Sequence, residues 1–295
     1  MTNTKTAAQP AGNLDPKWGA ASLFHEPALL AGFRPRATDV LITTAPKAGT
    51  TWMQQILYQL RSGGDESFDN IFDVVPWLEY RRPGVDVATM LRDYEAMSNP
   101  RIFKTHCTYE QTPGTDTVRI VMTSRDPRDC CVSYYHHMIN LADPIRDRLG
   151  VDENATFDDL FERWLAGGAW FRNIQSWWPH RTDANVLWLR YEDMKRDLEQ
   201  AVDSIVGFLG WTLEPDQKAR VLEHCSFEWM KRHNAKFSAV PGYTISEHFE
   251  KGGLIRKGKV GDYKTLLSKQ QEQRILDQAR EMLEPECLVF LGLVP

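Results

Sequence analysis

Three segments of the chain combine cations with small residues in a way that could hold an anion. Residues 45–52, centred on Lys47, read Ala-Pro-Lys-Ala-Gly-Thr-Thr-Trp. A second segment carries Arg125 and Ser133, and a third, residues 254–263, carries an Arg-Lys-Gly run. Guanidinium and ammonium groups donate charge-assisted hydrogen bonds to phosphate-like oxygens, and glycine allows close backbone approach. The chain therefore has suitable side chains for a ligand with two separate anionic groups.

Each segment also has a purely structural interpretation. The first could be an ordinary strand-to-helix turn with a surface lysine, Arg125 could pair with Asp126 or Asp129, and the third could be a solvated basic loop. The first segment is not a Walker A loop, because that motif places its lysine directly after a glycine, whereas the lysine here precedes the glycine. Taken one at a time, the segments leave both interpretations open.

A histidine ends the run Arg-Ile-Phe-Lys-Thr-His at residues 101–106. An imidazole at the carboxyl end of a strand, near the same rim as an anion-binding loop, is placed to act as a general base on a hydroxyl group. When His106 is considered alone, a histidine satisfied inside the core is the alternative.

Alternating strands and helices must position these residues. Short hydrophobic runs predict strands, and amphipathic or capped segments after them predict helices. The expected strands are residues 39–44, 101–105, 118–123 and 185–189, and the expected helices include residues 51–61, 127–138, 157–178 and 193–210. This alternation predicts an α/β fold with a central parallel sheet flanked by helices, in which ligands gather at the carboxyl ends of the strands.

Composition and charge narrow the class of protein. The 295 residues include 35 basic and 40 acidic ones, a formal net charge of −5, so the chain lacks the basic footprint of a general nucleic-acid binder. The start has no apolar core and no run of 18 apolar residues occurs, so neither a signal peptide nor a membrane span is expected. Five cysteines without a C-x-x-C pair favour a reducing, cytoplasmic location. Residues 1–15 are expected to be a flexible tail and residues 16–295 one domain.

Taken together, the segments resemble the cytosolic-type sulfotransferases. PKAGTTW, RIFKTH, SRDPRDCCVSYYH and RKGKVGDYK match signature segments of that family in order and approximate spacing, and VPWLEY and RYEDM match further ones. The match extends from about Asp39 to Lys264. The resemblance, to a bacterial-type member, implies a single P-loop-kinase-like α/β domain. Its strand-loop-helix would bind 3′-phosphoadenosine 5′-phosphosulfate (PAPS).

The resemblance also implies roles for the matching residues. PAPS would donate its sulfuryl group to a hydroxyl, or less readily an amine, of a small-molecule or lipid-like acceptor, leaving 3′,5′-ADP (PAP). No metal is implied, and the sequence lacks HExxH, CxxC and EF-hand spacings. His106 would be the catalytic base, with Lys104 beside the transferring group and Lys47 at the leaving oxygen. Ser133, also counted among the catalytic residues, would bind the 3′-phosphate. The nucleotide would contact Lys47, Ala48, Gly49, Thr50, Thr51, Trp52, Arg125, Ser133, Tyr191, Phe227, Arg256, Lys257 and Gly258. The acceptor would contact Trp77, Tyr80, His106, His137, Phe237 and Tyr243.

The chain departs from the family pattern at three places. Cys225 stands where a threonine near the adenine is usual, which predicts a lost hydroxyl contact. His137 stands where phenol-sulfating members have an aromatic residue, which predicts a more polar acceptor pocket. Lys264 is followed by Ser268 and Gln273 instead of the family's dimer motif, so the oligomeric state is left open.

Two other functions are compatible with a parallel sheet and an anion-binding loop of this kind. A magnesium-dependent small-molecule kinase would share the sheet and a phosphate loop, but it needs a magnesium carboxylate and a lysine after the glycine. A non-catalytic nucleotide-binding protein of the same fold would not need His106 beside the donor sulfur. Stabilisation by 3′,5′-ADP without magnesium, together with turnover of an acceptor, distinguishes the sulfotransferase from both.

Overall fold

The chain folds around a four-stranded sheet in which each strand is parallel to its neighbours. The computed structural model describes residues 14–237, 249 and 253–294. The sheet has the order β2-β1-β3-β4, and its strands are β1 (Val40–Thr44), β2 (Ile102–Thr105), β3 (Arg119–Ser124) and β4 (Val186–Arg190). The predicted α/β class with a parallel central sheet is confirmed.

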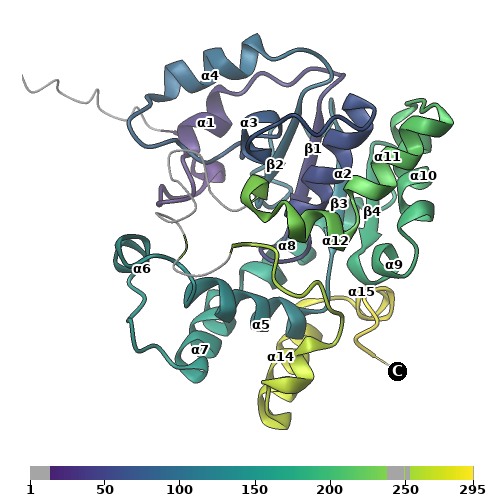
Figure 1. The fold of residues 1–295 in the computed structure, drawn as a ribbon. Coiled ribbons are helices and arrows are strands. Elements are labelled where there is room, and N and C mark those ends of the chain that lie inside the picture. The colour runs from purple at the N-terminus through teal and green to yellow at the C-terminus, as the bar shows by residue number, and fades with distance from the viewer. Residues whose placement is uncertain (1–13, 238–248, 250–252, 295) are drawn as a thin grey trace, which may run out of the picture.

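Helices cover both faces of the sheet (Figure 1). On one side α2 packs against β1, β2 and α11, and on the other α5 packs against α7 and α14. The α-helices are α1 (Pro27–Gly32), α2 (Thr50–Ser62), α3 (Ile71–Val74), α4 (Val87–Ala96), α5 (Pro127–Met138), α6 (Asp143–Leu149), α7 (Phe157–Gly167), α8 (Ala169–Trp177), α9 (Tyr191–Arg196), α10 (Leu198–Leu209), α11 (Pro215–His224), α12 (Phe227–Arg232), α14 (Lys269–Met282) and α15 (Pro285–Phe290). Short 3₁₀ helices are η1 (Pro16–Trp18), η2 (Trp178–His180), η3 (Asn234–Phe237) and η4 (Asp262–Thr265).

β1, β2 and β3 after its first residue are buried without alternation, because both faces of the sheet are covered there, whereas the residues of the edge strand β4 are half-buried. Successive side chains of a strand point to opposite faces. Leu41 and Ile120 therefore belong to the core beneath α5, α7 and α8, whereas Ile42 and Val121 belong to the core beneath α2 and α10. All five residues of β1 are buried. This central strand supplies the rigid base on which the loop after Thr44 is held.

Two of the expected long helices are each divided in two. The predicted helix 157–178 is interrupted at Gly168, whose φ of +58° ends α7 and begins α8. The predicted helix 193–210 is interrupted at Asp197, whose side chain accepts a hydrogen bond from the N–H of Gln200 and caps α10. Periodicity does not detect a one-residue break that leaves both halves with an apolar face. The predicted tail lies outside the described residues as far as residue 13.

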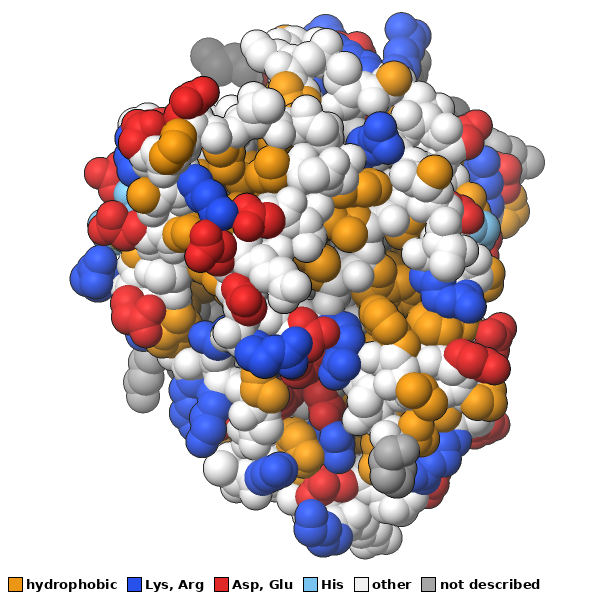
Figure 2. All heavy atoms as spheres, turned by 90° about the vertical axis from the view of Figure 1, so that its right-hand side faces the viewer, with side chains coloured by type: hydrophobic (Ala, Val, Ile, Leu, Met, Phe, Trp, Pro, Cys, Tyr) orange, Lys and Arg blue, Asp and Glu red, His pale blue; other side chains and the backbone are white. Residues whose placement is uncertain are grey.

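The surface has no large area of a single charge on the face shown in Figure 2, where Lys and Arg side chains are interspersed with Asp and Glu. This agrees with the small net charge of −5. Among the described residues, no helix combines the length and the apolar character needed to cross a bilayer.

Candidate active site

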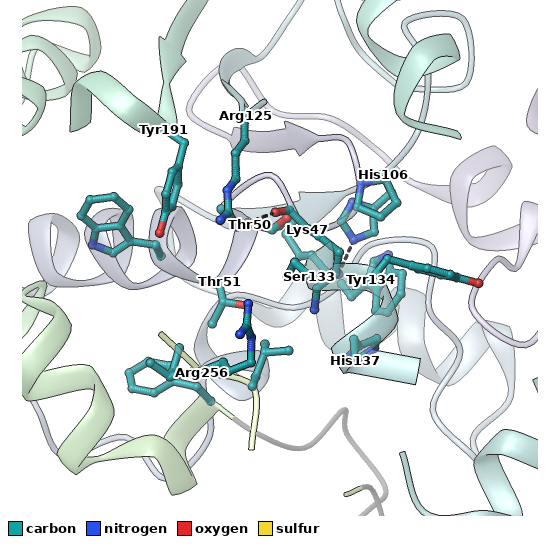
Figure 3. Close-up of a pocket in the computed structure, with 18 of the residues that line it drawn as sticks. Lys47, Thr50, Thr51, His106, Arg125, Ser133, Tyr134, His137, Tyr191 and Arg256 are labelled. Carbon is teal, nitrogen blue, oxygen red and sulfur yellow. Dashed lines mark hydrogen bonds between the residues drawn. The ribbon is translucent and has the colours of Figure 1, made fainter. Parts of the chain in front are cut away.

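The residues expected to do chemistry follow the carboxyl ends of the four strands. His106 follows β2, Lys47 lies in the loop after β1, Arg125 follows β3 and Tyr191 follows β4. Neighbouring strands lie about 4.8 Å apart, so the order β2-β1-β3-β4 places these groups in one row along the sheet edge. Figure 3 shows their side chains around a common space. Along the row, the imidazole of His106 comes first, followed by the basic side chains of Lys47 and Arg125 and then the aromatic ring of Tyr191.

The loop after β1 turns sharply into α2. Lys47 has a φ of +70° and Gly49 a φ of +99°. A Cβ atom at Gly49 would lie 2.8 Å from the ring of Tyr191, so this position requires glycine for both space and conformation. No described side chain caps the N-terminus of α2. The N–H groups of the first turn therefore stay available to an anion beside Lys47.

A cavity of about 690 Å³ extends along this row. Every residue expected to contact the nucleotide lines it except Ala48, whose side chain is buried in the core and whose carbonyl accepts a hydrogen bond from Thr123. Lys104, expected beside the transferring group, also lines it. Residues from six separate segments thus face one space.

One carboxylate ties the basic segment 254–263 to α5. Asp129 accepts the backbone N–H of Gly261 at 2.8 Å and that of Tyr263 at 3.0 Å. The same carboxylate lies 3.6 Å from the guanidinium of Arg125. Arg125 therefore pairs with Asp129, as the structural interpretation allowed. It also lines the cavity, and its buried Nε has no hydrogen-bond partner among the described residues.

Arg256 likewise keeps an unused donor. Its Nη2 donates to Asp262 at 2.6 Å, whereas its buried Nη1 has no hydrogen-bond partner within the described part of the chain. Buried donors are nearly always paired in folded proteins, so an unpaired one indicates a missing acceptor. Gly258 follows with a φ of +58°, and a Cβ there would lie 2.5 Å from the ring of Phe227. The segment is therefore shaped for close contact with an anion and an aromatic wall.

That aromatic wall is built around Trp52. Its indole N–H donates to the carbonyl of Cys225 at 2.8 Å, and its ring meets Tyr191 edge-on with centroids 5.4 Å apart. Lys195 lies 5.8 Å from the ring of Trp52 and 5.5 Å from that of Phe227. The Cys225 side chain is fully buried and does not line the cavity. Cys225 therefore acts on this wall through its backbone, by holding the indole.

His106 is held by hydrogen bonds on both sides of its ring. Nδ1 lies 2.8 Å from the carbonyl oxygen of Thr44, which can only accept, so Nδ1 carries the proton. Nε2 therefore keeps its lone pair and lies 3.1 Å from the ammonium of Lys104. Trp77 packs edge-on against the imidazole with centroids 5.2 Å apart. The ring is thus oriented with its basic nitrogen next to a lysine.

Burial inside the cavity disfavours positive charge on its basic side chains. Burial, helped by the charge of Arg125, lowers the pKa of Lys47 to about 7. Burial and the nearby Lys47 lower the pKa of Lys104 to about 7, against the opposing effect of Glu79. Burial and the charge of Lys104 hold the pKa of His106 well below its usual range, so the imidazole is neutral at pH 7. An anion in the cavity would reverse these shifts for the lysines.

Aromatic side chains form the other end of the cavity. Phe24 and Trp77 stack with centroids 5.5 Å apart and both line it. His137 and Phe237 also line it, as expected, but Tyr80 does not, because it is buried behind Trp77 against the stack. The expected contact Tyr243 lies outside the described residues.

Glu79 is a functional candidate that sequence reasoning missed. Its Oε1 accepts the backbone N–H of His106 at 2.8 Å. The preceding residues pair with β2, since Leu78 donates to the carbonyl of Lys104 and Lys104 donates to that of Pro76. The VPWLEY segment thus holds both Lys104 and His106 in place. The match of VPWLEY to a family segment could have drawn attention to Glu79. The match alone does not show which groups the Glu79 carboxylate contacts.

Comparison with known proteins gives one consistent result. A family model described as "Sulfotransferase domain" matches residues 37–284. Sulfotransferase 1A1 of Canis lupus familiaris is 32% identical over 266 residues, 86% of each chain. Amine sulfotransferase of Oryctolagus cuniculus is 31% identical over 274 residues, 89% of this chain and 86% of the relative.

Solved structures agree with this match. Mouse sulfotransferase SULT7A1 complexed with PAP superposes with a TM-score of 0.70 at 25% identity, covering 90% of this chain and 92% of its own. Retinol dehydratase in a complex with retinol and PAP superposes with a TM-score of 0.70 at 25% identity, covering 88% and 87%.

Proposed function

The chain belongs to the sulfotransferase domain family, and from that premise we propose that it transfers the sulfuryl group of PAPS to a hydroxyl of a small, largely apolar acceptor. His106 is the general base. The observation that carries the proposal is the order of the strands, which puts a neutral imidazole next to Lys47 and Lys47 next to Arg125. PAPS supplies an activated sulfuryl group joined to a good leaving phosphate.

The residues present fit PAPS at both of its anionic ends. The uncapped start of α2 and Lys47 suit the phosphosulfate. The unpartnered Nε of Arg125 and Nη1 of Arg256 suit a second phosphate, as donors for its oxygens. Trp52 and Phe227 both line the cavity and suit a planar base.

In the proposed mechanism the proton moves from the acceptor hydroxyl to Nε2 of His106. The Thr44 carbonyl holds the tautomer that leaves this nitrogen basic, and it stabilises the imidazolium that forms. Lys104 must release Nε2 first, and an anionic group beside it gives the ammonium a stronger partner. Lys47 neutralises the negative charge that develops on the leaving oxygen.

The lining supports an apolar acceptor. Phe24, Trp77, Phe237 and Phe249 all line the cavity, and Trp77 packs directly against His106. Retinol dehydratase, of similar fold, was crystallised with the apolar alcohol retinol. His137 and Glu79 add two polar groups to this lining, in keeping with the more polar pocket expected from His137.

The direct test is transfer from labelled PAPS to a panel of apolar alcohols, phenols and amines, with EDTA present, followed by mass spectrometry. We expect at least one alcohol or phenol to gain the mass of one sulfuryl group. The same protein should be stabilised against heat by PAP without magnesium. Stabilisation by ATP that requires magnesium, with no effect of PAP, would favour the kinase instead.

Arg256→Ala is expected to weaken PAP binding by about 10- to 100-fold, since a hydrogen bond to a charged group contributes about 1.5–3 kcal/mol. Isothermal titration calorimetry measures the affinity. Arg280→Ala, which removes a surface arginine paired with Asp277, is the matched control and should bind PAP normally. Unchanged affinity in Arg256→Ala would remove this residue from the phosphate site.

PAP binding is expected to take up between about one and two protons at pH 8. The pKa of Lys47 and of Lys104 is about 7 in the free site, and a bound anion raises both. As far as these two lysines determine it, the affinity for PAP should therefore be greatest below pH 7, where both are protonated, and should fall as the pH rises from 7 to 9. Calorimetry in buffers of different ionisation enthalpy measures the uptake, and Lys47→Met should reduce it by about one proton. Heats independent of buffer would contradict the prediction.

A further inference from the structure

Three potential metal ligands from distant parts of the chain meet at the end of the cavity that holds His106. His25 precedes α1, Glu79 follows α3 and Cys107 follows β2. One ligand atom of each lies within 4.8 Å of the other two, and all three residues line the cavity. The sulfuryl transfer proposed above uses none of these three side chains as a reacting group.

Glu79 has an oxygen that the fold leaves unused. The residue is only 1% exposed, and its Oε1 accepts the N–H of His106. Its Oε2 is buried with no hydrogen-bond partner among the described residues. A buried carboxylate oxygen without a donor is costly unless a cation or a proton satisfies it. Lys104 is a cationic neighbour of this carboxylate, since the charge of Glu79 raises the pKa of that lysine. Oε2 nevertheless accepts no hydrogen bond and is therefore available as a metal ligand.

His25 is held in the way that metal-binding histidines are held. Its Nε2 lies 2.6 Å from the carbonyl oxygen of Trp18, so Nε2 carries the proton and Nδ1 keeps its lone pair. A ligating imidazole commonly donates its other N–H to a backbone carbonyl, which fixes ring orientation. His25 thus has both the free nitrogen and the supporting contact of a ligand.

Cys107 is anchored through its backbone. Its N–H donates to Thr105 Oγ1 at 3.0 Å, and its carbonyl accepts from Asn173 and from Trp177 at 3.0 and 3.2 Å. Burial, with the nearby Glu79, holds the pKa of the thiol well above its usual range. A metal that binds the sulfur takes the place of the thiol proton.

We propose that His25 Nδ1, Glu79 Oε2 and Cys107 Sγ form a zinc site whose fourth position opens into the cavity. A thiolate, an imidazole and a carboxylate are the ligand types that zinc takes, and three protein ligands leave one position for water. The ligand atoms lie within 4.8 Å of one another. Tetrahedral bonds of about 2.0–2.3 Å to one ion bring its ligands to roughly 3.3–3.8 Å apart, so the three side chains must move inward when the metal binds. No sequence motif announces this site, because its ligands are 54 and 28 residues apart.

The test uses the full chain, freed of metal with EDTA and then dialysed. Zn²⁺ is titrated against a chromophoric chelator at pH 7.5. We expect one ion per chain with submicromolar affinity, and at least tenfold weaker binding in Cys107→Ser and in His25→Ala. Cys287→Ser, at another buried cysteine that is remote from the cavity lining, is the matched control and should bind as the parent does.

Cobalt provides an independent readout. Co²⁺ bound to the parent should give a near-ultraviolet sulfur-to-metal charge-transfer band that Cys107→Ser lacks. Thermal unfolding checks that each variant is folded, and the half-buried His25 carries the test if Cys107→Ser does not fold. Absence of stoichiometric zinc in the parent, or equal affinity in the parent and His25→Ala, overturns the proposal. Neither result bears on PAP binding, which uses other residues.

Discussion

The His106→Ala variant is expected to transfer sulfuryl groups about 10²- to 10⁴-fold more slowly than the parent protein, because a general base contributes a factor of that size. PAP affinity should be unchanged, since the unprotonated Nε2 faces Lys104 and the acceptor end of the cavity. Single-turnover transfer from labelled PAPS measures the first quantity, and calorimetry the second.

A conservative variant separates chemistry from positioning. In His106→Asn the side-chain amide can still donate to the Thr44 carbonyl, as Nδ1 does, but it offers no basic nitrogen. We expect this variant to be as slow as His106→Ala. His180→Ala, at a histidine outside the cavity lining, should be as active as the parent. Normal turnover in His106→Asn would show that His106 is not the base.

Lys47→Met is expected to lower the rate of transfer by about 10²- to 10³-fold, the effect of removing one preorganised electrostatic contact to developing charge. Methionine is unbranched like lysine and one atom shorter, and it carries no charge. The φ of +70° is strained for either residue, so the backbone cost is similar in both proteins. The rate should fall more than the affinity for PAP, because negative charge on the leaving oxygen is greatest in the transition state.

The comparison needs kcat and PAP affinity measured on the same preparation. Lys218→Met is the matched control, since Lys218 pairs with Glu199 and Asp203 on the surface and should leave transfer unchanged. If Lys47→Met lost affinity and rate by the same factor, Lys47 would hold the ground state only. It would then have no special part in the transfer step.

Glu79 belongs to both the zinc site and the transfer site, but it takes part in each through a different carboxylate oxygen. Glu79 holds the backbone of His106 through Oε1, and its Oε2 is the zinc ligand that we propose. A metal at that position would draw electron density from the carboxylate and so weaken its hold on the His106 loop. Bound zinc is therefore expected to reduce transfer, and EDTA to restore it.

The local hydrophobic pattern was sufficient to predict the strands and one of the helices that flank the sheet. All four predicted strands appear within one residue of their expected bounds, because short, uninterrupted hydrophobic runs have few alternatives in a sheet buried on both faces. The predicted helix 127–138 is confirmed as α5. The breaks at Gly168 and Asp197 were not predicted, since a cap can interrupt a helix without disturbing its apolar periodicity.

Single residues show where the sequence was insufficient. Ala48 lies within the anion-binding segment, yet its side chain faces the core. Tyr80 lies within an expected acceptor segment, yet it packs behind Trp77. Adjacent residues of a loop or strand point in different directions, and only the packed neighbours decide which direction faces the cavity.

The amino-acid sequence by itself determined which groups are available: a loop with Lys47, a histidine after a strand, and two further cationic segments. The tertiary structure alone decided their neighbours. Along the chain β1 comes first, but in the sheet it lies between β2 and β3, which places Lys47 between His106 and Arg125. Hydrogen bonding between strands far apart in sequence sets that order, and no local pattern encodes it.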